Sequence, residues 1–159
     1  MSDPKLTRFA AIADAHGNAD ALAAVLADID AQGVREIVNL GDHVSGPLAP
    51  GETAALTLSR PMISLRGNHD RWALGLGPEP AGSSDRLAFE EMDQAQRDWL
   101  ASLPASRQVG DVFLCHGAPE SDLTYWLERP IPRPGAPLGI TVPRGLDEVA
   151  RLAEGVEAG

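Results

Sequence analysis

Short apolar runs alternate with helical stripes along most of the chain. Between the first two runs, apolar residues recur at the spacing of a helix that begins near Asn18 or Asp20 and ends near Gly33. Short strands that alternate with helices in this way are typical of βαβ units and a largely parallel sheet. The runs that predict buried strands cover residues 7–13, 35–40, 61–66 and 111–117.

The segments between and after these runs complete an α/β pattern. Residues 51–59 predict a short helix, and residues 75–85 predict a polar loop rich in glycine and proline. A longer helix follows this loop and ends before Pro104. Residues 130–143 hold five prolines, which predicts an extended loop, and residues 145–155 predict a final helix.

Length and composition are those of one globular domain. It has 159 residues, of which 43% are apolar, and no linker divides it, so we expect a single domain over residues 1–159. No stretch approaches the roughly 18 consecutive apolar residues of a membrane helix, and the N-terminus lacks the apolar segment of a signal peptide. The sequence therefore predicts a cytoplasmic protein without a membrane partner. The single Cys115 agrees with a reducing compartment.

The charge of the chain argues against one class of partner. Lysine and arginine number 13 against 23 aspartates and glutamates, which gives a formal net charge of −10. A broad basic face for wrapping DNA or RNA is therefore not expected. An anionic substrate would need a local source of attraction, and bound metal ions would supply one.

Polar side chains follow each of the four predicted strands. Because ligands of an open α/β sheet bind beyond the carboxyl ends of its strands, we expect these side chains to lie side by side at one edge of a single sheet. They offer oxygen and nitrogen but no sulfur, a set that suits Mn, Fe, Zn or a similar divalent ion better than a structural cysteine-rich zinc site. In chain order they are Asp14, His16, Asp42, Asn68, His69 and His116.

Four short motifs carry a family resemblance. "DAHGN", "GDHVSGP", "GNHD" and "HGAP" occur in this order, each after a predicted strand. Together they resemble the successive motifs of the calcineurin-like metallophosphoesterases, in particular the small bacterial members, over roughly residues 8–126. The resemblance implies a mixed α/β fold, arranged as a four-layer αββα sandwich with two packed sheets.

The resemblance also implies a site for two divalent ions, with Mn, Fe, Zn or Ni as candidates. Asp14 and His16 would bind the first ion, and Asn68 and His116 the second. Asp42 would bridge both ions, because the two oxygens of one carboxylate can serve both. The neighbouring His43 has no ligand counterpart in the motif.

Residues around "GNHD" are implied to act on the substrate. His69 would lie beside the scissile phosphate as a catalytic residue, with Asp70 as its orienting partner. Arg66 and Arg71 flank the motif and would meet the substrate phosphate or pair with carboxylates of the protein. Asn18 stays open between a helix cap and a support for the ligands.

The implied function is hydrolysis of a phosphate ester. Two ions can generate hydroxide from water near neutral pH and neutralise the charge that builds on the phosphoryl oxygens. The substrate would be a phosphorylated small molecule, a nucleotide or a phosphoprotein, with either a monoester or a diester bond. The alternative is a degenerate scaffold that keeps the fold, binds metal or a partner, and does not catalyse.

One departure from the family pattern bears on this choice. Members usually continue to a Gly-His-x-His motif that adds a histidine to each ion, whereas this chain reaches Gly159 without one. We therefore expect a C-terminally truncated form with an incomplete second sheet. An exposed sheet edge would favour a homo-oligomer.

Overall fold

The computed structural model describes residues 6–77 and 83–156. Its centre is a parallel sheet of three strands in the order β1-β2-β3, formed by Phe9–Ile12, Glu36–Asn39 and Ile63–Ser64. Ala10 pairs with Ile37, and Val38 pairs with Ile63. The first three predicted strands are thus confirmed, and their carboxyl ends face the same edge.

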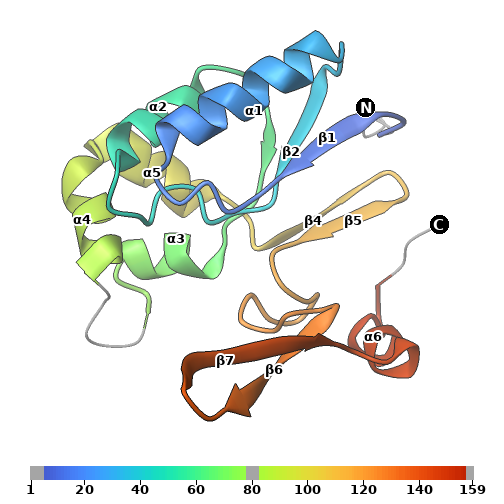
Figure 1. Cartoon of the computed structure of the whole chain (residues 1–159). Coiled ribbons are helices and arrows are strands. Elements are labelled where there is room, and N and C mark those ends of the chain that lie inside the picture. The colour runs from blue at the N-terminus through green and yellow to red at the C-terminus, as the bar shows by residue number, and fades with distance from the viewer. Residues whose placement is uncertain (1–5, 78–82, 157–159) are drawn as a thin grey trace.

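Two helices cover one face of this sheet (Figure 1). α1 (Ala19–Ala31) follows β1, and α2 (Pro50–Leu58) follows β2. The Asn18 side chain accepts a hydrogen bond of 3.0 Å from the Ala21 amide, which assigns Asn18 as the cap of α1. In the predicted helical stripe, Val25 is 43% exposed, and the other three residues pack on the sheet together with Ile37. They are Leu22, Leu26 and Ile29.

The single long helix predicted before Pro104 is instead two helices. After α3 (Asn68–Ala73) come α4 (Ser83–Glu91) and α5 (Gln94–Ser102). The break arises at Asp93, whose carboxylate accepts from the Gln96 amide at 2.8 Å while the Gln96 side chain accepts from the Asp93 amide. This capping box starts a new helix. Part of the predicted loop 75–85 belongs to α4, and residues 78–82 lie outside the described residues.

A separate pair of strands covers the opposite face of the parallel sheet. β4 (Ser106–Val109) and β5 (Val112–Cys115) are antiparallel to each other. Val109 and Leu114 pack with Val38 and Leu65 of the central sheet. The prediction that the fourth strand belongs to the same sheet as the first three is therefore wrong. β4 escaped prediction because three of its four residues are exposed, which leaves no apolar run.

The C-terminal segment forms a second antiparallel pair. β6 (Glu128–Arg133) pairs with β7 (Ala136–Pro143), with a register shift between Ile131 and Arg133. The predicted extended loop over residues 130–143 is wrong. An isolated hairpin leaves one edge of each strand unpaired, and proline is tolerated at such edges and at irregularities. The predicted final helix is confirmed as α6 (Leu146–Leu152).

The pair α1 and α2, the parallel sheet and the β4–β5 pair thus form three layers, as Figure 1 shows, in a mixed α/β fold. Among the residues whose burial is described, none after Ala118 is buried. None of the described helices is long and apolar enough to cross a membrane.

Candidate metal centre

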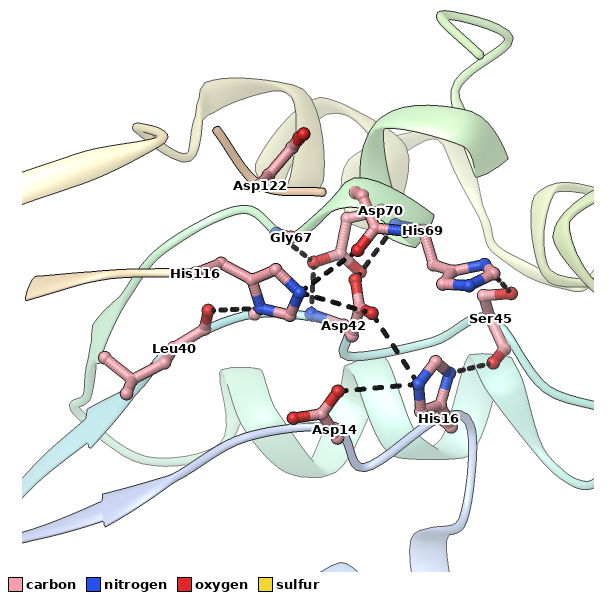
Figure 2. A network of polar contacts seen from close by, with 12 residues as sticks. Asp14, His16, Leu40, Asp42, Ser45, Gly67, His69, Asp70, His116 and Asp122 are labelled. Atoms are coloured by element: carbon pink, nitrogen blue, oxygen red, sulfur yellow. Dashed lines mark hydrogen bonds and ion pairs between the residues drawn. The ribbon is translucent and has the colours of Figure 1, made fainter. Parts of the chain in front are cut away.

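One cleft of about 850 Å³ collects the polar residues that follow the strands. All five predicted metal ligands line it, together with His69. Figure 2 shows the side chains of Asp14, His16, His69 and His116 around the carboxylate of Asp42. The ligand candidates are Asp14, His16, Asp42, Asn68 and His116.

Backbone hydrogen bonds join the loops after β1 and β2. The amide of Asp14 donates to the Gly41 carbonyl, and the amide of His16 donates to the Asp42 carbonyl, both at 3.0 Å. Asp14, His16 and Asp42 have φ angles of 56°, 47° and 55°. Left-handed backbone at a non-glycine residue costs about 1–3 kcal/mol, and it persists only where surrounding contacts impose it. The fold thus holds the backbone of these three residues in a strained conformation that directs their side chains toward one another.

The third loop is joined to the same centre through Asp42. The amide of His69 donates to Asp42 Oδ1 at 2.9 Å. Gly67 makes this approach feasible, because a Cβ atom at that position would collide with the carboxylate and the amide of Asp42. The strand end that carries His116 is fixed by a 3.0 Å hydrogen bond from His116 Nδ1 to the Leu40 carbonyl.

Asp42 lies between the two sets of donors. Its Oδ2 is 3.6 Å from His16 Nε2 and 3.5 Å from His116 Nε2. Asp14 Oδ1 lies 3.7 Å from His16 Nε2. Ligand atoms of Asp14, Asp42 and His116 all lie within 4.8 Å of one another, which is close enough to share a metal ion.

The hydrogen bonds of both histidines leave Nε2 free to bind. His16 Nδ1 is 2.6 Å from the Ser45 carbonyl, and His116 Nδ1 is 3.0 Å from the Leu40 carbonyl. Since a carbonyl only accepts, each Nδ1 carries the proton. In its neutral form, each ring then presents a lone pair at Nε2, the state that a metal ligand needs.

The chemistry of the donor set fits a cation. Asn68 Oδ1 faces His116 Nε2 at 3.1 Å, so two acceptors face each other. Rotating the amide would relieve this contact, because its nitrogen would then donate to His116 Nε2 and to the Asp122 carbonyl. A cation bound by both atoms would relieve it without rotation. The candidate residues therefore suit divalent ions.

The pKa values of three site residues are shifted by burial and by the pairing of acids with histidines. The Asp14 carboxylate raises the pKa of His16 to about 9, and the same pair lowers the pKa of Asp14. Burial raises the pKa of Asp42. The site without metal thus favours extra positive charge.

Asp70 does not orient His69, so that prediction is wrong. Its carboxylate accepts from the amides of Gly67, Asp42 and His43 at 2.8–2.9 Å, and it is fully buried. Its oxygens are saturated by the turn that carries Asp42. Asp70 is therefore a structural residue that couples the second and third loops.

The partner of His69 is Asp85, a residue that sequence reasoning missed. Asp85 Oδ1 lies 3.0 Å from His69 Nδ1, and Asp85 is buried with 2% of its surface exposed. Sixteen positions separate the two residues, and no motif marks Asp85. Only its place in the first turn of α4 brings it to the histidine.

Neither the flanking arginines nor His43 is among the described residues that line the cleft. Arg71 makes a two-pronged ion pair with Asp122, at 3.0 and 2.9 Å, so it pairs with the protein rather than facing an open phosphate site. Arg66 is not one of the described residues that line the cleft. His43 is buried, and its Nε2 donates to the Leu65 carbonyl at 2.8 Å.

The carboxylates, histidines and amide gathered at these strand ends form a donor set that suits divalent cations. The chain belongs to the calcineurin-like phosphoesterase family, whose sequence model matches residues 7–146.

Solved structures agree with this fold. A metallophosphoesterase from Sphaerobacter thermophilus is 30% identical with a TM-score of 0.57, over 72% of this chain and 48% of that one. A hypothetical protein from Pyrococcus horikoshii is 20% identical with a TM-score of 0.58, over 72% of this chain and 56% of that one; it supports the fold alone.

A curated relative matches a shorter segment. An uncharacterized protein of Methanocaldococcus jannaschii is 42% identical over 66 residues, which are 42% of this chain and 27% of that protein. The chain thus matches about half the length of the solved structures and about a quarter of this relative.

Proposed function

We propose that this chain carries the catalytic site of a metal-dependent hydrolase of phosphate esters that uses two divalent ions. The observation that supports this proposal best is the position of Asp42 Oδ2, within 3.6 Å of Nε2 in both His16 and His116. A carboxylate placed between the Nε2 atoms of two histidines is suited to bridge two cations. Family membership supports the same reaction class.

Each ion would have three protein ligands, with Asp42 shared. Asp14 and His16 would hold one ion, and Asn68 and His116 the other. When bound, such ions lower the pKa of water and offset charge on the phosphoryl group. Mn, Fe, Zn and Ni all suit this mixed oxygen and nitrogen set.

His69 would act on the substrate rather than on the metal. Its ring lines the cleft next to His16, with 5.2 Å between ring centroids. Its Nδ1 faces Asp85, so Nε2 is the atom available for a phosphoryl oxygen or for the leaving oxygen. We infer that His69 stabilises charge there or protonates the leaving group. The substrate is proposed as a phosphate monoester or diester.

The test combines metal removal with one variant. After chelation, hydrolysis of p-nitrophenyl phosphate and of bis-p-nitrophenyl phosphate should be lost and should return with Mn²⁺. His69→Asn should retain the metal content while kcat falls by about 10²–10⁴. Metal binding without hydrolysis of any phosphate ester would favour the non-catalytic scaffold. Equal activity of the wild type and His69→Asn would contradict the role of His69 in the reaction.

Self-association is a separate proposal with its own measurement. A homo-oligomer should show a molar mass above 16.8 kDa in light scattering, whereas the value of one chain would contradict it.

A further inference from the structure

Asp85 is a buried acid that none of the candidate metal positions uses. Its side chain is 3% exposed, and it is not one of the described residues that line the cleft. Its Oδ1 lies 3.0 Å from His69 Nδ1 and accepts a 2.5 Å hydrogen bond from Ser45 Oγ. Burying a carboxylate is costly unless hydrogen bonds compensate it, and these two contacts do so.

The contact determines which nitrogen of His69 carries a proton. A carboxylate only accepts hydrogen bonds, so Nδ1 is the donor and carries the proton. On the opposite side of the ring, Nε2 then bears a lone pair in the neutral form and a second proton in the imidazolium, which is the form that can protonate a leaving group. The ring is also held in place by edge contacts with Trp72, at 4.6 Å between centroids, and with His16.

Ser45 links this contact to the ligand cluster. Its hydroxyl donates to Asp85, while its backbone carbonyl accepts from His16 Nδ1 at 2.6 Å. One residue therefore fixes both the candidate ligand His16 and the partner of His69. Figure 2 shows the rings of His16 and His69 on either side of Ser45.

We propose that Asp85 is the positioning residue of His69: it holds the Nδ1–H tautomer and the ring orientation that present Nε2 to the cleft. The consequence for catalysis rests on the proposed function, whereas the tautomer does not. Asp70, which follows His69 directly in the sequence, cannot take this role because backbone amides occupy both of its oxygens.

The first test reads the tautomer in the metal-free protein. Two-dimensional ¹H–¹⁵N NMR of the histidine rings should show His69 with the proton on Nδ1, and the His69→Asn variant assigns its signals. His43, whose Nε2 donates to a carbonyl, should show the opposite tautomer and serves as an internal reference. In Asp85→Asn, the amide can donate to Nδ1, so the His69 signals should move to the Nε2–H pattern.

The second test is kinetic. Asp85→Asn should lower kcat about 10²-fold, as expected for a misplaced catalytic group, with KM and metal content near wild type. It should cause no further loss in the His69→Asn background, because its effect acts through that ring. Glu90→Gln, on the exposed side of the same helix, is the matched control and should change neither reading.

The outcomes separate this inference from the proposed function. An unchanged His69 tautomer in Asp85→Asn, or equal kcat losses with and without His69, would overturn the positioning role. An inactive wild type with the expected tautomers would overturn the proposed function while leaving the Asp85 contact established. Should Asp85→Asn fail to fold, Ser45→Ala removes one support of Asp85 and should give a smaller kcat loss; an unchanged kcat would contradict the proposal.

Discussion

Residues 6–77 and 83–118, here called the layered body, differ in construction from residues 119–156, the C-terminal region. All the described buried residues belong to the layered body. Both regions expose some large apolar side chains, such as Leu48 at 63% and Leu127 at 66%, but among the described residues only the layered body also buries such side chains. The layered body thus has a packed core, whereas the C-terminal region is held mainly by local pairing.

The two regions also contribute differently to the cleft. All five candidate ligands, His69 and Asp85 belong to the layered body, where crowding maintains strained backbone at three ligands. The C-terminal region adds only a wall, which includes Tyr125 and Trp126. The buried, closely packed region therefore carries the candidate chemistry, and the less buried region lines the approach to it.

The largest expected effect comes from removing the shared acid. Asp42→Asn should lower metal affinity at least about 10²-fold and abolish hydrolysis with it, because the amide has no charge to share between two ions. Metal analysis and the phosphate ester assay give both readings. Asp147→Asn, on exposed α6, should match wild type. Retention of two ions by Asp42→Asn would remove Asp42 from the bridging position.

Substitution of two glycines that precede helices, one in each region, allows a direct comparison of the regions. Gly67 caps α3 against Asp42, whereas Gly145 caps α6 with no other atoms within 4 Å of an added Cβ. Gly67→Ala should lower the free energy of unfolding by about 1–3 kcal/mol and reduce metal content, because the loops must separate. Gly145→Ala should cost less than about 1 kcal/mol. Equal losses in urea unfolding would contradict the contrast.

A smaller effect is expected where the two regions meet. Arg71 in α3 pairs with Asp122, and both side chains are about a quarter exposed, at 27% and 23%. Arg71→Ala should cost about 0.2–1 kcal/mol and speed hydrogen exchange in residues 119–156 more than in the sheet. Arg86→Ala, whose side chain is 74% exposed, is the control. Uniform acceleration across both regions would contradict a local role.

The smallest expected effect is that of pH on the stability of the metal-free protein. It concerns the layered body, which contains all four histidines. His16 has its pKa raised from 6.5 to about 9, so its contribution to metal-free stability is complete below pH 6.5 and lost as pH rises to about 9. Metal binding needs neutral His16, so affinity should rise over the same window. Melting temperatures of the chelated protein test this, and His16→Gln should flatten the dependence. If the melting temperature of His16→Gln changed with pH as in the wild type, another group would be the cause of the pH dependence.

Prediction from the sequence succeeded where local pattern and motif order agree. The first three strands follow apolar runs, and α1 follows its stripe and its Asn18 cap, so local preference and burial coincide there. It failed for β4 and for the β6–β7 hairpin. Exposed residues hide β4, and prolines suggested a loop where an isolated hairpin tolerates them.

The same division holds for the candidate site. Strand ends marked by glycine and by acidic, amide or imidazole side chains identified the ligand candidates. The shared direction of β1, β2 and β3 brings three of these ends together, whereas His116 comes from the separate β4–β5 pair. Asp70 and Asp85 could not be told apart in this way. Adjacency in the chain favoured Asp70, but the turn directs its carboxylate to three backbone amides.

The sequence by itself thus determined the parallel sheet, the family and the residues at the strand ends, since these depend on local periodicity and motif order. Tertiary structure alone decided that the His116 strand lies in a separate pair, that Asp85 rather than Asp70 contacts His69, and that Arg71 is paired with Asp122. These features depend on contacts between elements distant in the chain. At such contacts, the direction of a side chain depends on the hydrogen-bond and packing partners that the folded layers place around it.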